Sequence, residues 1–355
     1  MKFTAIGLDI AKNVFHVYGI REDGEIVKKV LRRKQVLEYF AQVESGVVGL
    51  ESCGSAHYWA RELKKIGHTV KLINPRLVKP YVKSNKNDFN DAEAIFEAVM
   101  RPNMRFVAVK TVEQQDLQAL HRIRQSLVVS RTALVNQIRG LLSEYGIVIG
   151  KGINQVRKVL PEILEDGENG LAALGRELFA ERYEQLKDLD RQIGEQDERI
   201  GRLAQQNELS RRLVEIPGIG PVTATAVAAD IGEGKPYRNG RDYAASLGIV
   251  PRQHSSGGKS QLLGISKRGN RYLRTLLIHG ARAVLNTIER KTDPLSRWLK
   301  ELKRRRGANI AAVALANKNA RIIWALASTG ASYQSAEARA GIRPGASLVL
   351  HTGYE

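Results

Sequence analysis

The chain has 355 residues, more than one ordinary domain, which predicts two or three units with their own cores. Its 56 Lys and Arg against 37 Asp and Glu give a net charge of +19. This charge argues against an acidic solvating protein and against a small enzyme for neutral substrates. It indicates a polyanionic partner. A hydrophobic share of 43% and a charged share of 26% are typical of a globular chain.

The sequence also indicates where the chain works. A lone cysteine, Cys53, cannot form an internal disulfide, so we expect a reducing compartment. The first residues, MKFTAIGLDIAKN, lack the long apolar run of a signal peptide. No stretch approaches about 18 uninterrupted apolar residues, so we expect no membrane span and no membrane partner. The expected polyanion is therefore DNA or RNA, and the expected location is cytoplasmic and nucleoid-associated.

The first hundred residues alternate strand and helix patterns. Three apolar, β-branched runs joined by short turns predict an antiparallel meander, and helices and strands alternate after it. The pattern predicts strands at 3–10, 14–20, 25–31, 46–52 and 68–75, and helices at 34–43, 57–67 and 88–100. This order predicts a mixed sheet with helices packed on it. A doubly wound dinucleotide-binding unit would not begin with a meander, and GLDIAK lacks its glycine spacing.

The middle of the chain is predicted to be helical. Residues 113–145 and 175–206 carry apolar residues at three- and four-residue spacing, and a Gly-rich connection with a short helix separates them. Two such helices predict an antiparallel coiled-coil arm, which acts as a spacer or a dimerisation stalk.

The last third is helical and strongly basic. Residues 251–306 hold 15 Lys or Arg and three acidic residues. The tail after residue 330 is rich in Ala, Gly and Ser and is expected to be flexible. The predicted domains are therefore 1–110, an arm over 111–208, a DNA-binding domain over 209–330 and a tail over 331–355.

Four acidic residues stand where predicted elements end or begin. Asp9 closes the first strand, Glu51 closes the fourth, and Asp88 and Asp91 lie one turn apart at a helix start. Strands one and four can be neighbours in such a sheet, and a helix across their ends would add the other two acids. Crowded carboxylates need cations, and oxygen ligands favour Mg²⁺ or Mn²⁺. Each acid alone is more often a turn or cap residue, so only the four together predict a site.

Two segments of the last third have the chemistry to contact phosphate. In IPGIGPVTA, which resembles a helix-hairpin-helix element, Gly218 and Gly220 would let backbone N–H groups approach a phosphate; an ordinary tight turn is the alternative. PRQHSSGGKS, residues 251–260, is predicted to be a flexible loop whose serine could attack a phosphodiester among fixed cations; a plain linker is the alternative. Spacing does not choose between Ser255, Ser256 and Ser260. The expected nucleic-acid-binding cations are Arg252, Lys259, Lys267, Arg268, Arg271 and Arg274.

In this order, the motifs resemble those of the IS110/IS1111 family of insertion-sequence transposases, over roughly residues 3–330. GLDIAK, GLESCG, LINP and KNDFNDAEAI are similar to the four blocks of its N-terminal RuvC-like domain. IPGIGPVTA, LGIVPRQHSSGGK and ISKRGNRYLR are similar to blocks of its C-terminal transposase domain.

The resemblance implies a RuvC-like, RNase H-type first domain with Asp9, Glu51, Asp88 and Asp91 as an Asp-Glu-Asp-Asp metal site. It implies a helical second domain whose nucleophile maps to Ser256. It also implies a structured guide RNA from the element, and a homo-oligomer, dimer or tetramer, in which one subunit's acidic site meets another's serine domain. The function it implies is RNA-guided, site-specific DNA recombination. A metal-dependent nuclease or resolvase that uses water, or a non-catalytic nucleic-acid-binding scaffold, is the alternative.

Overall fold

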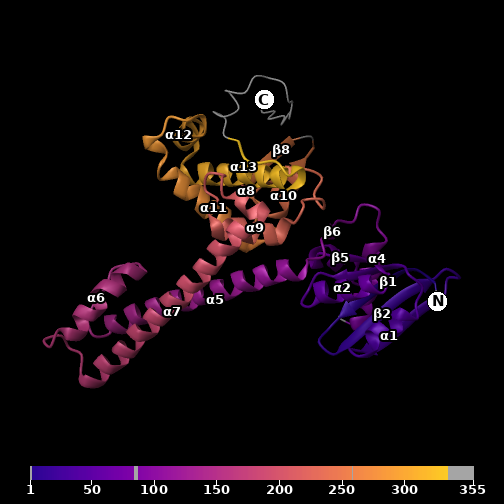
Figure 1. The fold of residues 1–355 in the computed structure, drawn as a ribbon, viewed down its shortest axis with the longest axis horizontal. Coiled ribbons are helices and arrows are strands. Elements are labelled where there is room, and N and C mark those ends of the chain that lie inside the picture. The colour runs from indigo at the N-terminus through magenta and orange to yellow at the C-terminus, as the bar shows by residue number, and fades with distance from the viewer. Residues whose placement is uncertain (1, 84–86, 258, 335–355) are drawn as a thin grey trace. The chain divides into compact units, whose positions relative to one another are not determined.

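A computed structural model describes residues 2–83, 87–257 and 259–334. The chain divides into two compact units, residues 1–112 and 113–355. Most of the predicted tail, residues 335–355, lies outside the described residues. The structure is a mixed α/β unit followed by a helical one, as predicted (Figure 1).

The first unit contains a six-stranded sheet of order β3-β2-β1-β4-β5-β6. The first three strands, β1 (Phe3–Ile10), β2 (Val14–Arg21) and β3 (Ile26–Arg32), form the predicted antiparallel meander. β4 (Val47–Glu51) runs parallel to β1, and β5 (Thr69–Ile73) runs parallel to β4. The expected neighbourhood of the first and fourth strands is therefore confirmed. The sequence patterns missed β6 (Phe106–Val107), which pairs antiparallel with β5 and has only two residues.

Helices cover both faces of this sheet. α1 (Gln35–Ala41) and α2 (Ala56–Lys65) pack on one face, where Leu8 and Leu50 share a buried cluster with Phe40 and Trp59. α4 (Asp88–Val99) packs on the other face, where Ile95 and Phe96 share a second cluster with Ala5 and Tyr18. The short helices α3 (Pro75–Val78) and η1 (Lys79–Tyr81) lead towards α4. Each face thus has its own apolar core.

The second unit begins with an arm of two long helices, α5 (Val112–Ser143) and α7 (Ala173–Gln206), with α6 (Ile153–Glu165) between them. Arg124 pairs with Asp197, and Arg131, seven residues later, pairs with Asp190, seven residues earlier. Partners that advance along one helix and retreat along the other show that α5 and α7 run antiparallel, as predicted.

Further helices form a bundle at the base of the arm: α8 (Glu208–Leu213), α9 (Pro221–Ile231), α10 (Gly240–Ser246), α11 (Arg271–Leu285), η2 (Ile288–Arg290), α12 (Pro294–Arg306) and α13 (Ala308–Thr329). Leu277 and Leu315 are fully buried in its core. By length and composition, α13 is the one helix among the described residues that could cross a membrane. Half of its most apolar stretch is buried within the protein.

A buried histidine joins α5 to this bundle. His121 is 3% exposed, and its Nε2 and Nδ1 lie 3.0 Å from Thr225 Oγ1 on α9 and from Tyr272 Oη on α11. Burial, and secondarily the charge of Arg124, lower the pKa of His121 to about 4, so the ring is neutral at physiological pH. The base of the arm is thus tied to the bundle by a neutral hydrogen-bonded ring.

Candidate active site

Two glycines explain why α4 lies so close to the sheet. Gly7 precedes Asp9 by two residues and Gly49 precedes Glu51 by two, so each glycine shares a sheet face with its acid. A Cβ built on Gly7 would stand 2.1 Å from the carbonyl oxygen of Ala92 on α4. A Cβ on Gly49, which pairs with Gly7 across the strands, would meet Val99 at 3.0 Å. The glycines let α4 lie on the face that carries both acids.

The same packing brings the four predicted acids close enough for their charges to affect one another. Asp9 and Glu51 end neighbouring strands and are half-buried, whereas Asp88 and Asp91 lie in the first turn of α4, which Asn87 caps through a 3.0 Å hydrogen bond from the Phe89 N–H. Burial raises the pKa of Asp9, and the charges of Asp91 and Asp88 raise it further. Burial, followed by the charges of Asp9 and Asp91, raises the pKa of Glu51. Residues from three separate segments therefore repel one another at one place.

The chemistry of this group suits a divalent cation. All four side chains supply carboxylate oxygens, which hard ions such as Mg²⁺ and Mn²⁺ prefer, and their mutual repulsion is what a cation relieves. As the side chains stand, no three His, Cys, Asp or Glu among the described residues are placed to share one metal ion. The donors fit such an ion in type, and holding it would require them to turn towards a common point.

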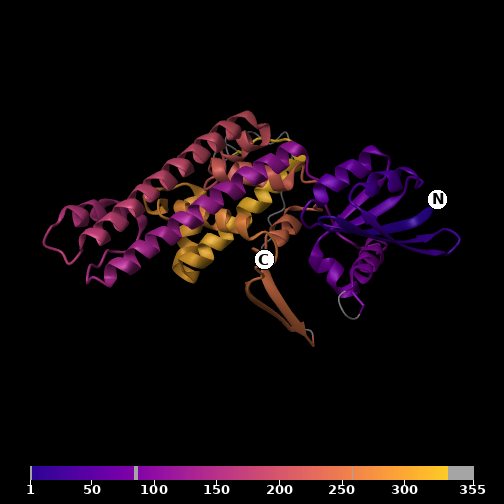
Figure 2. The same cartoon turned by 90° about the horizontal axis from the view of Figure 1, so that it is seen from below.

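The segment that carries the candidate serine is not the flexible loop that its composition predicts. Residues 251–256 and 259–265 form the antiparallel hairpin of β7 (Pro251–Ser256) and β8 (Lys259–Ile265). The ribbon extends from the helical bundle, and every residue of β7 is exposed (Figure 2). Because neither face is buried, the strands lack the apolar alternation that predicts a strand. The Gly-Gly dipeptide between them, with Gly257 at a φ of +56°, was the available signal for a two-residue turn.

The hairpin distinguishes Ser255 from Ser256. Successive residues of a strand point to opposite faces, so the two hydroxyls lie on different sides of the ribbon. Ser255 Oγ accepts a hydrogen bond of 2.8 Å from Gln253 Nε2. Ser256 is the cross-strand partner of Lys259, the last pair before the turn. Ser256 thus has a cation beside it on the same face. Ser260 faces Ser255 in the register.

The candidate cations divide into exposed and structural residues. Arg252, Lys259, Lys267, Arg268 and Arg271 are exposed. The Lys267–Arg268 loop is held because the Lys267 N–H donates to the Gly248 carbonyl at 3.0 Å. Arg274 is half-buried and donates to the carbonyl oxygen of Leu247 at 2.9 Å, so its side chain helps to hold the fold.

The two glycines of the IPGIGPVTA turn have different surroundings. Gly218 has a φ of +87°, and its Cβ would stand 2.8 Å from the carbonyl oxygen of Gly280 on α11, so it serves close backbone packing. Gly220 precedes Pro221 at the start of α9, and nothing lies within 4 Å of its Cβ position. Gly220 therefore remains open to a ligand, whereas Gly218 already has a structural reason to be glycine.

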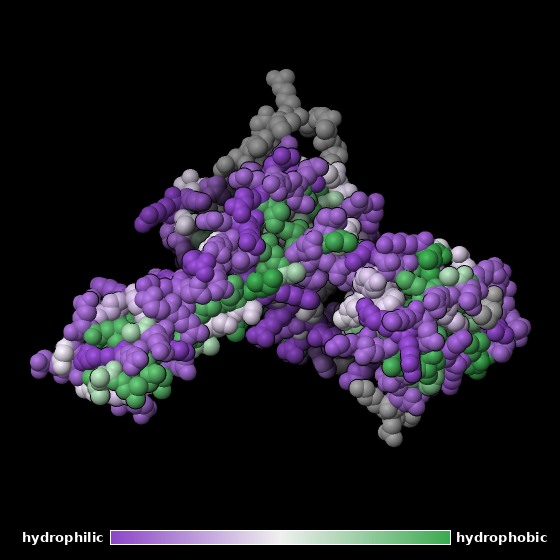
Figure 3. Space-filling model, turned by 60° about the horizontal axis from the view of Figure 1, so that its bottom comes forward, coloured by the Kyte–Doolittle hydropathy of each residue, from purple (hydrophilic) through white to green (hydrophobic). Residues whose placement is uncertain are grey.

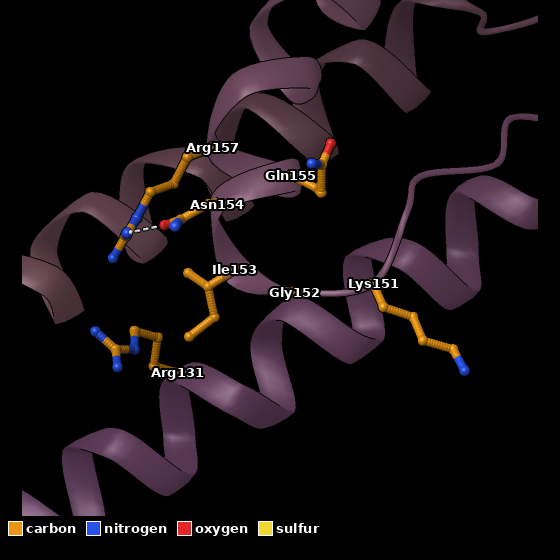
Figure 4. A pocket seen from close by; sticks show the side chains of 7 residues that line it. All are labelled: Arg131, Lys151, Gly152, Ile153, Asn154, Gln155 and Arg157. Atoms are coloured by element: carbon orange, nitrogen blue, oxygen red, sulfur yellow. Dashed lines mark hydrogen bonds between the residues drawn. The ribbon is translucent and has the colours of Figure 1, made fainter. Parts of the chain in front are cut away.

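A cavity in the arm, of about 640 Å³, lies outside these groups. Its walls are Arg131, Lys151, Gly152, Ile153, Asn154, Gln155 and Arg157. Figure 4 shows Arg131 and Arg157 on one side of Gly152 and the Lys151 side chain on the other. Both arginines bind Asp190 of α7, at 2.8 and 2.5 Å. Their charges thus join the three helices of the arm.

Sequence reasoning missed one residue of the acidic face, the side of the sheet that carries Asp9 and Glu51 and that α4 covers. His16 on β2 is the cross-strand partner of Asp9, and its Nε2 lies 3.8 Å from Asp88 Oδ2. The available signal was the predicted meander, since the turn between the first two strands fixes which residue faces Asp9.

Comparison with known proteins shows the family of the chain. Residues 6–147 match the DEDD-type family model described as "Transposase", and residues 210–295 match the model "Transposase IS116/IS110/IS902 family". The chain is 49% identical over 336 residues to a probable family 20 transposase of Pseudomonas aeruginosa, covering 94% of this chain and 99% of the relative. It is also 49% identical over 330 residues to the transposase for insertion sequence element IS1111A of Coxiella burnetii, covering 93% and 91%.

A transposase for element IS1328 of Yersinia enterocolitica is 41% identical over 330 residues, covering 92% of this chain and 97% of the relative. These matches span both units and include the segments that carry the four acids and the serine hairpin. A DEDD-type domain implies a nuclease-like site that depends on a divalent metal. The chain therefore belongs to the IS110/IS1111 family of transposases, enzymes that act on DNA.

Proposed function

We propose that this transposase is an RNA-guided, site-specific DNA recombinase that uses an acidic metal site and a serine nucleophile. The observation that carries the proposal is that Asp9 and Glu51 lie near the ends of neighbouring strands on the sheet face that α4 covers, while Asp88 and Asp91 lie in the first turn of α4. Excess positive charge in the second unit supports DNA and RNA as partners. The proposed fold of the first unit is RuvC-like.

The four carboxylates are proposed to hold Mg²⁺ or Mn²⁺. A bound divalent ion would polarise a phosphodiester as a Lewis acid. The half-buried Asp9 and Glu51 would provide fixed donors, because their strands are packed on both faces. Asp88 and Asp91, on the first turn of α4, would close the set when DNA and metal are present.

Ser256 is proposed as the nucleophile. Its Oγ would form an ester bond to phosphorus while the bond from phosphorus to one deoxyribose oxygen breaks, and the hydroxyl proton would pass to that leaving oxygen. The covalent link conserves a phosphoester for rejoining. Ser256 is preferred to Ser255 because Lys259 lies opposite it, whereas the Ser255 hydroxyl accepts a bond from Gln253.

The exposed cations near the hairpin are proposed to bind the DNA backbone and the charge that develops on phosphorus. They are Arg252, Lys259, Lys267, Arg268 and Arg271. Gly220 is proposed to give a backbone phosphate contact at the start of α9, in a helix-hairpin-helix-like element.

Guide RNA and self-association complete the proposal. Pairing between RNA and DNA would supply sequence choice, while the protein binds phosphates and shape. The arm supports a homo-oligomer, as a coiled-coil stalk, because apolar side chains are exposed at its far end (Figure 3). These are Leu141, Val148, Leu174 and Leu178.

The test is capture of the covalent intermediate. Full-length protein is incubated with DNA carrying its element's ends, Mg²⁺ and co-purified RNA, then denatured and digested for mass spectrometry. We expect a nucleotide on Ser256, present in wild type and in Ser255→Ala and absent in Ser256→Ala. Cleavage without an adduct would assign the attack to water and contradict the serine role. An adduct that persists in Ser256→Ala would assign it to another residue.

A further inference from the structure

His16 lies on the acidic face of the first unit. It sits on β2 directly across from Asp9 in the antiparallel register. Cross-strand partners project their side chains to the same face of a sheet, and the Asp9 face is the one that α4 covers. His16 therefore stands between the end of β1 and the beginning of α4.

The histidine lies beside Asp88, a candidate metal ligand whose side chain is largely exposed. The Asp88 side chain is 60% exposed, whereas the His16 side chain is 13% exposed. His16 Nε2 lies 3.8 Å from Asp88 Oδ2, and the imidazole packs edge-on against the Phe89 ring, with centroids 4.9 Å apart. A nearly buried ring thus lies against the first two residues of α4.

One nitrogen of the imidazole has no hydrogen bond within the described part of the chain. His16 Nδ1 is buried and has no hydrogen-bond partner among the described residues. A phenylalanine would fill the same space and keep the contact with Phe89 without a buried polar atom, whose desolvation costs free energy. A histidine here therefore calls for a polar role, and its other nitrogen, Nε2, lies 3.8 Å from the carboxylate of Asp88, a proposed metal ligand.

We propose that His16 is a positioning residue that holds the Asp88 carboxylate towards Asp9, so that the four carboxylates can close around a divalent ion. The inference rests on the proposed acidic site and adds to it a residue from β2. Polar groups behind a ligating carboxylate commonly orient it, and their loss typically costs 10- to 100-fold in metal affinity.

The experiment measures Mn²⁺ binding to the full-length protein by isothermal titration calorimetry. His16→Phe keeps the ring and removes the nitrogens, whereas His16→Gln keeps a polar end. Tyr18→Phe is the matched control, because Tyr18 lies two residues along the same strand and packs on Phe96 of α4. Thermal melting in EDTA checks that each variant is folded.

We expect His16→Phe to weaken Mn²⁺ binding by about tenfold or more, His16→Gln to weaken it less, and Tyr18→Phe to leave it unchanged. Wild-type affinity in His16→Phe, or equal losses in the Phe and Gln variants, would overturn the inference. Asp9→Asn separates the two proposals. If it abolishes binding while His16→Phe does not change it, only the role of His16 fails; if wild type itself binds no Mn²⁺, the acidic site fails with it.

Discussion

The acidic face and the serine hairpin have opposite structural support. Asp9 and Glu51 end strands packed by apolar cores on both sides, and α4 approaches through Gly7 and Gly49. Ser256 stands on a two-stranded ribbon whose first strand is exposed throughout. The strands that carry Asp9 and Glu51 are held by the fold, whereas we expect bound DNA to order the exposed ribbon. The proposed enzyme would thus combine acids on a packed sheet with a serine that its substrate orders.

The largest expected effects come from removing one acid of the metal site or the candidate serine. Asp9→Asn and Ser256→Ala should each reduce in-cell excision at least about a thousandfold, because each removes an essential part of one reaction. Only Asp9→Asn should also lose Mn²⁺ binding, measured by calorimetry. Ser255→Ala is the control and should retain excision. Unchanged excision by Asp9→Asn would favour a non-catalytic scaffold.

A substitution that moves α4 away from the sheet, without changing an acid, should also reduce stability. Gly7→Ala places a methyl group 2.1 Å from the Ala92 carbonyl, so α4 must move away from β1. We expect a loss of about 1–3 kcal/mol in the free energy of unfolding by urea denaturation, together with weaker Mn²⁺ binding. Gly46→Ala is the control, since its nearest contact would be an ordinary 3.7 Å. Equal stability of the two variants would show that α4 does not depend on Gly7.

The raised pKa values of Asp9 and Glu51 predict a smaller, pH-dependent effect. A carboxyl whose pKa is raised on folding favours the folded state below its unfolded pKa, about 4, and that contribution is lost as pH rises through the folded value. In EDTA, the melting temperature of Asp9→Asn should therefore exceed that of wild type by a few degrees near neutral pH and by less near pH 4. Mn²⁺ should reverse the order at neutral pH. A difference in melting temperature that does not change with pH would contradict the proposed repulsion between the acids.

The smallest effect is expected in the hairpin. Leu262 on β8 is 67% exposed, so Leu262→Ser should change the free energy of unfolding by less than about 0.5 kcal/mol. In hydrogen exchange, amides of β7 should exchange much faster than those of β1 and should slow when DNA binds. Slow exchange in the free protein would show that the ribbon is already fixed.

The sequence predicted the first unit well because its core is strongly patterned. The meander and the pairing of the first and fourth strands follow from apolar runs and turn residues, and they bring Asp9 and Glu51 together. The close approach of α4 could not be read from periodicity. It depends on Gly7 and Gly49 lacking side chains, which only the pairing of their strands places in one row.

The second unit shows where such patterns fail. β7 and β8 bury no face, so polar residues such as Gln253 and His254 concealed a strand. The motif predicts phosphate binding by Gly218, and the structure adds a packing role that no pattern predicts, since Gly218 lies against Gly280, some sixty residues away. His16 escaped notice because a single histidine in a strand becomes informative only when its cross-strand partner is known.

The most direct test of the central claim is a crystal structure of the full-length protein grown with Mn²⁺, with anomalous scattering recorded at the manganese edge. The account predicts anomalous peaks bounded by the carboxylates of Asp9, Glu51, Asp88 and Asp91, with the last two turned inward from α4. Manganese bound elsewhere, with these four side chains turned to solvent, would contradict it.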